Sequence, residues 1–371
     1  MSSDESDYSA DTYANESAGS STPGERGAGK RSHDQRRRER YAALDLGTNN
    51  CRLLIAAPRG RGFRVIDAFS RIVRLGEGLS TTGALDEAAM ERAISAIAEC
   101  ADKIERRGAT HIKCIATQAC RTARNGDAFL ATVKERTGLE FEIITPEEEA
   151  RLAVSGCREL IDEEAKAALI FDIGGGSTEL SWLQKRGDAF ELAAWMSMPI
   201  GVVSLSEKWN GRDLTADAYS AAVREAREAL SAFSDADHLK ADFVAGDAHL
   251  LGTSGTVTSI AGVHLKLPRY RRDKVDGIWL DITDAKEVSD QLRAMSFEAR
   301  ADEPCIGRER ADLVVCGCAI LEAIVEVWPT QRIRVADRGL REGLLADLAR
   351  DARRARRRRR RRKKNRKAKS D

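Results

Sequence analysis

The sequence predicts an α/β fold made of two duplicated domains, and three observations support this prediction. The chain has 371 residues, which is more than one hydrophobic core usually serves. Three apolar strands joined by short turns occur twice, first from Tyr41 and again from Ala167. In each copy the first strand ends in an aspartate, Asp45 or Asp172, that leads directly into a turn of small residues.

The first copy is expected to begin an α/β sheet. Its strands are predicted at residues 41–46, 51–57 and 63–72, with turns short enough to require antiparallel pairing. Residues 86–106 then carry Ala and Ile at helical spacing. Further strands are predicted at 112–116 and 141–144. The alternation of strand, helix and strand extends the three-stranded unit into an α/β sheet.

Residues 145–152 predict the start of a helix. Thr145 suits the N-cap, Pro146 the first helical position and Glu148 the third position of a capping box. A structural role is therefore available for Glu148. The next residue, Glu149, has none beyond a favourable interaction with the helix dipole.

The second copy is predicted to repeat the first and to add helices. Its strands are expected at 167–171, 178–184 and 190–198. The later elements are expected as helices at 203–209 and 215–233, a strand at 249–251, a helix at 311–327, a strand at 333–335 and a last helix at 340–348. The turn at 252–256 would open one more helix, where free backbone N–H groups favour an anion.

These elements predict an N-terminal domain over residues 40–160 and a C-terminal domain over 161–350, with the last helix able to pack back on the N-terminal domain. Residues 1–39 are almost without apolar side chains, and residues 351–371 carry 14 Lys/Arg and 2 acidic residues, so both segments are predicted to be disordered. The rest of the chain is acidic, with 47 basic and 57 acidic residues. The basic tail is expected to bind polyanions, and RNA, the ribosome and polyphosphate are all candidates.

Composition also limits the location of the protein. No apolar run approaches the ~20 residues that a membrane span needs, and the N-terminus lacks the apolar core of a signal peptide. We therefore expect a cytoplasmic protein without a membrane partner. The eight cysteines lie mostly in apolar stretches without metal-binding spacing, which favours a role in core packing.

The two aspartate turns predict a phosphate site. Gly, Ser and Thr let backbone N–H groups approach an anion, while an aspartate can hold a divalent cation against it. A single Gly-rich turn can equally be a tight hairpin, and Asp also caps turns. The duplication favours a ligand, because unrelated hairpins seldom share strand, aspartate and turn at the same relative places. Two facing turns would hold one phosphate chain from both sides.

Several motifs of the chain together resemble one protein family. They are Asp45-Leu-Gly-Thr-Asn49, Ala116-Thr-Gln-Ala-Cys-Arg121, Glu147-Glu-Glu-Ala-Arg-Leu152, Asp172-Ile-Gly-Gly-Gly-Ser-Thr-Glu-Leu180, Gly252-Thr-Ser-Gly-Thr256 and Arg338-Gly-Leu-Arg-Glu-Gly343. In this order they are similar to the exopolyphosphatase and guanosine pentaphosphate phosphohydrolase (Ppx/GppA) family. The resemblance covers residues 41–348. It implies two ribonuclease-H-like domains of the actin, Hsp70 and sugar-kinase superfamily, with mixed sheets on either side of an interdomain cleft.

The resemblance also implies roles for single residues. Glu149 would be the general base that orients an attacking water, and Arg121 would contact the transferred phosphate. Asp45 and Asp172 would hold Mg²⁺, directly or through water. The other residues expected to bind phosphate are Thr48, Asn49, Gly174, Gly175, Gly176, Ser177, Gly252, Ser254, Gly255, Arg310 and Arg338.

The predicted activity is that of an exopolyphosphatase, which releases orthophosphate from the end of inorganic polyphosphate by Mg²⁺-assisted, in-line attack of water. The alternative substrate is guanosine pentaphosphate. Two other classes are an ATP-dependent kinase of the same superfamily and a non-catalytic protein tethered to RNA, and the Glu149 motif argues against both. We also expect a homodimer. Relatives with additional C-terminal helical domains have a longer polyphosphate channel, so the sequence does not predict processive action on long chains.

Overall fold

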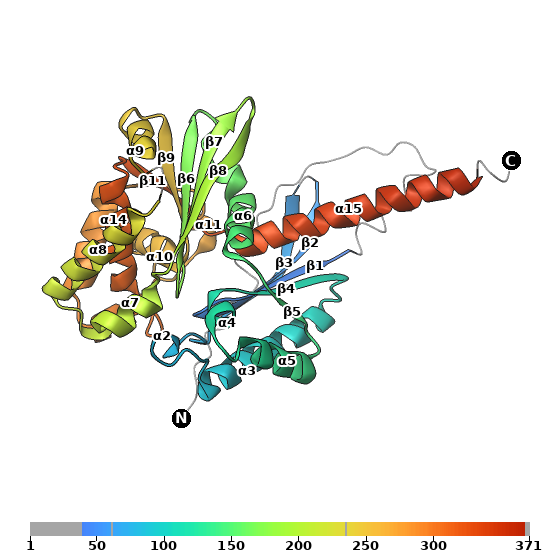
Figure 1. Ribbon diagram of the computed structural model, residues 1–371, viewed down its shortest axis with the longest axis horizontal. Coiled ribbons are helices and arrows are strands. Elements are labelled where there is room, and N and C mark those ends of the chain that lie inside the picture. The colour runs from blue at the N-terminus through green and yellow to red at the C-terminus, as the bar shows by residue number, and fades with distance from the viewer. Residues whose placement is uncertain (1–38, 61, 234–235, 368–371) are drawn as a thin grey trace.

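The computed structural model describes residues 39–60, 62–233 and 236–367, and these form two α/β domains (Figure 1). Residues 1–38 of the N-terminal segment predicted to be disordered lie outside the described residues. Each domain is built on one β-sheet. The strands of the first sheet are β1 (Tyr41–Leu46), β2 (Asn50–Arg59), β3 (Gly62–Ile72), β4 (His111–Ala116) and β5 (Phe141–Ile143). Those of the second sheet are β6 (Ala167–Ile173), β7 (Thr178–Arg186), β8 (Ala189–Met198), β9 (Ala248–Thr253), β10 (Trp279–Asp281) and β11 (Arg332–Ala336).

The two sheets share one strand arrangement. The strand order is β3-β2-β1-β4-β5 in the first sheet and β10-β11-β9-β6-β7-β8 in the second. The first strand of each copy pairs antiparallel with the next strand along the chain, β1 with β2 and β6 with β7. Its other neighbour, β4 or β9, runs parallel to it. Both sheets are therefore mixed, and the predicted duplication of an α/β domain is confirmed.

Strand β1 is buried on both faces, so the first sheet needs a cover on each side. Because successive side chains point to opposite faces, Ala42 and Leu44 pack into one apolar cluster and Tyr41 and Ala43 into another. The first cluster is completed by the helices α3 (Glu87–Arg106) and α5 (Gly126–Thr137). Two short helices precede them along the chain. Helix α2 (Leu79–Thr82) lies between β3 and α3 in the sequence, and α4 (Gln118–Thr122) lies between β4 and α5.

The second sheet is covered in the same way. Its main apolar core contains Leu169 and Phe171 of β6 and the buried faces of helices from the C-terminal domain. These helices are α7 (Val202–Trp209), α8 (Ala216–Leu230), α10 (Gly255–His264), α12 (Ile282–Ala294) and α14 (Val314–Val327). Shorter helices are α9 (Ala236–Val244), α11 (Arg272–Val275) and α13 (Phe297–Asp302). On the opposite face, Ala168 and Ile170 pack with Cys157.

Two helices connect the domains at one end of the molecule. Helix α6 (Pro146–Cys157) leads from the first sheet to the second, and α15 (Leu340–Lys367) returns from the second sheet to pack on β1 and α6 (Figure 1). The hydroxyl of Thr145 accepts a hydrogen bond of 3.2 Å from the backbone N–H of Glu148, which confirms the predicted N-cap. The Glu148 carboxylate does not complete a capping box, because it forms an ion pair with Arg151 one turn later.

Helices α6 and α15 cross with their backbones in contact. A Cβ atom added to Gly343 of α15 would lie 2.1 Å from the carbonyl oxygen of Leu152 in α6. One added to Gly156 of α6 would lie 2.0 Å from the carbonyl oxygen of Gly339. Glycine is therefore required on both sides of the crossing. Helix α6, which carries Glu149 in its first turn, is thus fixed against α15.

The last helix is longer than the sequence analysis predicts. Its end is predicted at residue 348 and residues 351–371 are predicted to be disordered, whereas α15 continues to Lys367. Arg, Ala and Lys have high helix propensity, and no Gly or Pro follows Gly343, so nothing in the sequence stops the helix. In the part of the chain that the structure describes, no helix has both the length and the apolar character that crossing a bilayer requires.

Candidate active site

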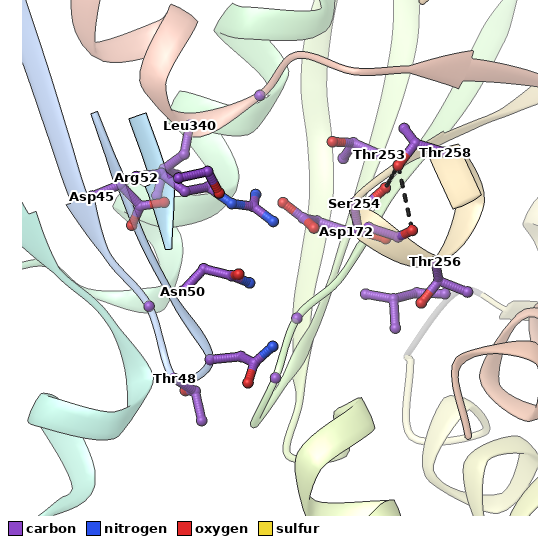
Figure 2. Close-up of a pocket in the computed structure, with 18 of the residues that line it drawn as sticks. Asp45, Thr48, Asn50, Arg52, Asp172, Thr253, Ser254, Thr256, Thr258 and Leu340 are labelled. Carbon is purple, nitrogen blue, oxygen red and sulfur yellow. Dashed lines mark hydrogen bonds between the residues drawn. The ribbon is translucent and has the colours of Figure 1, made fainter. Parts of the chain in front are cut away.

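The two aspartate turns face each other across a cleft between the domains. Figure 2 shows Asp45, Thr48 and Arg52 on one side of the cleft and Asp172 with Ser254 on the other. The turns are closed by equivalent backbone hydrogen bonds of 2.9 Å, from the Gly47 N–H to the Asn50 carbonyl and from the Gly174 N–H to the Ser177 carbonyl. The predicted pairing of the turns is therefore present in the structure.

The Gly-rich turn approaches the first turn too closely for side chains. A Cβ atom added to Gly175 would lie 3.1 Å from Cβ of Thr48 and 3.2 Å from the backbone nitrogen of Asn49. One added to Gly176 would lie 2.2 Å from the side-chain oxygen of Gln118. Glycines here leave backbone N–H groups uncovered at the head of the cleft, where an anion can reach them.

A third turn completes the phosphate-binding surface. Ser254 lies between β9 and α10 with φ of 104°, a left-handed conformation that is rare for a residue with a side chain. Its hydroxyl is buried and has no hydrogen-bond partner among the described residues. Both Ser254 and Gly255 line the cleft at the N-terminus of α10, so a bound anion would face the positive end of the helix dipole.

In each domain the aspartate of the first strand lies beside a charged residue of the second strand. Asp45 of β1 is paired in register with Arg52 of β2, and Asp172 of β6 is paired with Glu179 of β7. Arg52 and Glu179 occupy equivalent places in the two copies, and both line the cleft. The N-terminal domain therefore offers a cation where the C-terminal domain offers a carboxylate.

Six carboxylates line this cleft, and the pKa values of four of them, Asp45, Glu149, Asp172 and Glu179, are raised, in each case chiefly by burial. Burial raises the pKa of Asp45 to about 6, and the nearby Asp172 contributes to the increase. Burial raises the pKa of Glu179 to about 7 despite hydrogen bonds to its Oε1 from Ser177 (2.6 Å) and Ser197 (3.0 Å). Burial and the neighbouring Glu179 hold the pKa of Glu149 well above its usual range. Such clusters of perturbed carboxylates are typical of catalytic sites.

Glu149 lies in the first turn of α6 and lines the cleft. Its Oε2 is 3.3 Å from Nη1 of Arg121, and the same Nη1 donates a hydrogen bond of 2.7 Å to the carbonyl oxygen of Ile144. Arg121 is not among the described residues that line the cleft. In the structure this guanidinium contacts Glu149 and the Ile144 carbonyl, and the predicted contact between Arg121 and phosphate stays a prediction.

Positive charge in the cleft comes from other arginines. Arg52, Arg310 and Arg341 line it, and among the described residues their side chains form no hydrogen bond or ion pair. Burial lowers the pKa of Arg52, and the nearby Arg341 and Arg310 lower it further. Figure 2 shows Arg52 extending from the side of Asp45 toward Asp172. Three guanidinium groups that form no direct ion pair within the described residues are suited to binding a polyanion.

The chain matches one protein family over most of its length. The model of the Ppx/GppA phosphatase family matches residues 54–352. The chain belongs to the Ppx/GppA phosphatase family. This confirms the family and the fold that the motifs imply.

Two kinds of Ppx/GppA relative are similar to this chain. The guanosine-5'-triphosphate,3'-diphosphate pyrophosphatase of Photobacterium profundum is 30% identical over 311 residues, which is 83% of this chain and 59% of the relative. A crystal structure of the Aquifex aeolicus family member has a TM-score of 0.67 and 27% identity, covering 85% of this chain and 98% of the other. A crystal structure of an exopolyphosphatase-like protein has a TM-score of 0.76 and 28% identity, and the match covers 83% of this chain and 97% of the other. The chain thus spans about three fifths of the length of its curated relative.

The structure brings most of the predicted site residues of this Ppx/GppA protein together. The residues that were predicted and that line the cleft are Asp45, Thr48, Asn49, Glu149, Asp172, Gly174, Gly175, Gly176, Ser177, Ser254, Gly255, Arg310 and Arg338. Gly252 is not among the lining residues. It packs against Phe171, and a Cβ atom added to Gly252 would lie 2.6 Å from Cζ of Phe171. Arg338 lines the cleft but is held by Asp276 at 2.7 Å and by Glu159 at 3.1 Å.

The sequence analysis missed Arg52, Glu179 and Arg341 as site residues. Glu179 and Arg341 lie inside motifs that carry the family resemblance, so their positions could have been found there. Arg52 directly follows Cys51, which is the first residue after the small-residue turn. Aligning the two copies on Asp45 and Asp172 would have matched Arg52 to Glu179 and marked both.

The donors in the cleft fit a magnesium ion. Asp45 Oδ1 and Asn50 Oδ1 are buried and accept no hydrogen bond from any residue that the structure describes, and Asp172 lies across from them. Among the described residues, no group of three or more His, Cys, Asp or Glu side chains is placed to hold a metal by itself. Mg²⁺ commonly binds through one or two carboxylates and takes its other ligands from water and substrate phosphates. Asp45 and Asp172 match that requirement.

Proposed function

We propose that this chain is a hydrolase that removes the terminal phosphate of guanosine pentaphosphate, the 3'-diphosphate of guanosine triphosphate. The observation that carries the proposal is a single cleft in which Glu149, two phosphate turns and three unpaired arginines converge. The sequence analysis placed polyphosphate first and guanosine pentaphosphate second. The name of the curated relative favours the reverse order, and polyphosphate becomes the second candidate.

The residues of the cleft support hydrolysis of a phosphoanhydride bond. Backbone N–H groups of the two turns would hold the terminal phosphate, while Arg52, Arg310 and Arg341 would neutralise the phosphates that remain with the leaving group. Mg²⁺ held by Asp45 and Asp172 would offset negative charge on the bridging and terminal oxygens.

Glu149 would accept a hydrogen bond from a water and take its proton as the oxygen attacks the terminal phosphorus. One P–O bond forms, the bond to the leaving phosphate breaks, and orthophosphate is released. Arg121 keeps the Glu149 carboxylate in place during this step.

Substrate choice is tested by measuring orthophosphate release from guanosine pentaphosphate, medium-length polyphosphate and ATP. With Mg²⁺ present, we expect guanosine pentaphosphate to be hydrolysed at least tenfold faster than ATP and faster than polyphosphate, and EDTA to stop the reaction. Faster release from polyphosphate would reverse the order of the two substrates. No release from either, with transfer from ATP to an added acceptor, would show a kinase instead.

We also propose that the extended α15 binds RNA. Residues 353–367 contain 13 Lys/Arg, and they continue the helix beyond its apolar contact with the first sheet, whose last buried member is Ala352. The segment has no apolar face for a membrane or a protein groove. The rest of the chain is acidic and would repel nucleic acid, so binding would depend on this helix.

Replacing four arginines of this helix by glutamine is expected to weaken RNA binding of the full chain more than tenfold and to reduce the slope of log K against log salt by up to about 3. Glutamine keeps the helix propensity. The positions are Arg357, Arg358, Arg361 and Arg362, and the control is the same change at four exposed arginines of the body, Arg59, Arg64, Arg224 and Arg269. The measurement is a salt titration of RNA binding; equal slopes for both variants would contradict the proposal.

A further inference from the structure

Arg74 does not line the cleft, but it connects the two faces of the cleft at one end. We propose that Arg74 is a positioning residue that holds the first phosphate turn in register with the loop that carries Arg310. The inference rests on the function proposed above, because only a ligand that touches both faces requires this register. None of the motifs or the catalytic groups described so far includes Arg74.

The segment that contains Arg74 is attached to the first phosphate turn through its backbone. The carbonyl oxygen of Asn49 accepts hydrogen bonds from the N–H groups of Val73 (2.8 Å) and Arg74 (3.1 Å). The carbonyl oxygen of Thr48 accepts one from Gly76 at 2.9 Å. A shift of this segment would therefore move the turn that is expected to hold the terminal phosphate.

The side chain of Arg74 reaches the other domain. Its Nη1 donates a hydrogen bond of 2.9 Å to Oδ2 of Asp312, and its Nη2 donates one of 2.9 Å to Oδ1. Nη2 also donates one of 3.1 Å to the carbonyl oxygen of Glu309. The Asp312 side chain is 17% exposed, so the pair is partly shielded from water. A bidentate pair of this kind fixes orientation as well as distance.

Glu309 and Asp312 flank Arg310, which faces the cleft. The backbone of Arg310 is held in a turn by hydrogen bonds to its carbonyl oxygen from the N–H groups of Leu313 (3.0 Å) and Val314 (2.9 Å). Arg74 therefore holds this turn on both sides of Arg310. It fixes the distance between the Thr48 turn of one domain and the Arg310 guanidinium of the other.

The backbone of Arg74 supports a role for its side chain. Its φ of 48° lies in the left-handed region, which is unfavourable for a residue with a side chain relative to its preferred conformations. Glycine would relieve this strain but would remove the guanidinium. The position therefore keeps a strained residue whose contact crosses to the other domain.

The contacts around Arg74 are polar, unlike those at the other end of the cleft. A second bridge lies nearby, where Glu207 of α7 accepts hydrogen bonds of 2.7 Å from the Gly78 N–H and the Ser80 hydroxyl. At the far end, α6 and α15 pack closely and are continuous with both domains. In Figure 1, α2 lies against the side of α7, away from α15. Loss of Arg74 would thus loosen one end while the other stays fixed.

The first test is steady-state kinetics of the full chain with guanosine pentaphosphate. Arg74→Ala is expected to lower kcat/KM by about 10-fold to 100-fold, because displacements of the order of 1 Å have effects of this size. Arg74→Lys keeps the charge but cannot form the two parallel hydrogen bonds to Asp312, so its kcat/KM should lie between those of Arg74→Ala and wild type. The double variant Arg74→Ala, Asp312→Ala should be no worse than the poorer single variant, since both changes break the same pair. Additive losses would overturn the proposal.

The matched control is Arg107→Ala. Arg107 forms an ion pair of 2.7 Å with the buried Asp67, but both residues belong to the N-terminal domain. This variant should keep the wild-type kcat/KM. A similar loss in both variants would show that Arg74 acts through general stability and would overturn a positioning role.

A second readout does not depend on activity. All eight native cysteines are buried, so labels can be attached to the exposed positions Thr132→Cys and Ser220→Cys, one in each domain. Arg74→Ala should broaden the distribution of label distances without substrate, whereas Arg107→Ala should not. If the wild-type protein releases no phosphate from any substrate, the proposed function fails and the distances alone decide whether Arg74 holds the faces together. An unchanged distribution, or a broadened one with unchanged kcat/KM, overturns the proposal.

Discussion

Replacing Glu149 by glutamine is expected to remove nearly all phosphate release and, at the same time, to raise the midpoint of thermal unfolding. Glutamine cannot take a proton from the attacking water, and loss of a general base typically costs about 10²-fold to 10⁴-fold in rate. The stability gain has a separate cause. Burial and the neighbouring Glu179 make an ionised Glu149 unfavourable in the folded protein, as its raised pKa shows.

The stability effect depends on pH in a defined direction. A carboxyl whose pKa is higher in the folded state binds protons more tightly there, so the free energy of unfolding falls as pH rises above the unfolded value of 4.5. Wild type should therefore lose stability between pH 4.5 and neutral pH, and the Glu149→Gln variant should lose less. The difference in Tm between the two proteins, measured in EDTA, should be larger at about pH 8 than at about pH 5.

The control is the neighbouring glutamate. Glu148 pairs with Arg151 outside the cleft, and hydrogen bonding to Arg151 lowers its pKa, so Glu148→Gln should keep its activity and gain no stability at neutral pH. Two results would count against the assignment of Glu149. One is comparable rates of phosphate release in Glu149→Gln and wild type, and the other is an equal loss in both glutamine variants.

Replacing Gly343 by alanine is expected to have the largest effect on stability. The new Cβ would lie 2.1 Å from the carbonyl oxygen of Leu152, and that atom belongs to the backbone of α6 and cannot rotate away. Forcing the helices apart should cost about 3 kcal/mol, the upper part of the usual range for overpacking. With about 2.1 cal/mol/K of unfolding entropy per residue, a chain of 371 residues should lose about 4 °C in Tm.

Thermal unfolding followed by circular dichroism measures this change, and Gly62→Ala is the matched control. A Cβ atom at Gly62 would have no atom within 4 Å. The Gly343 variant should also lose activity below its Tm, because α6 carries Glu149. A wild-type Tm for Gly343→Ala would show that the crossing of α6 and α15 can adjust without cost.

The sequence predicted the parts of this protein that depend on local chemistry. Apolar runs bounded by short turns identified the strands, and the strand, aspartate and turn around Asp45 and Asp172 identified the two halves of the site. The N-cap at Thr145 was likewise a local pattern, confirmed by its hydrogen bond to the Glu148 N–H. These features depend on neighbouring residues, which a linear sequence displays directly.

Other features that depend on long-range contacts were not predicted. Arg52 and Arg341 meet only because β2 and the start of α15 come together in the folded chain, and an arginine by itself resembles a surface residue. The family resemblance implied a contact between Arg121 and phosphate, and that contact stays a prediction. The contacts of its guanidinium with the Ile144 carbonyl and Glu149 were not predicted. The end of α15 was predicted too early because a run of Lys/Arg was taken as a sign of disorder, whereas the helix continues to Lys367.

The return of α15 to the first sheet has a consequence for biosynthesis. Leu344 and Leu345 pack with Tyr41 and Ile115, so the cover of this face of the first sheet, to which Leu152 of α6 also belongs, stays incomplete until the end of the chain is made. At roughly 5 to 20 residues per second, the interval between translation of Ile115 and Leu345 is on the order of tens of seconds. During that time the nascent N-terminal domain exposes apolar surface that α15 covers in the folded protein. A message truncated before the codon for Leu340 would yield a product that never buries this face and that should be degraded or aggregate.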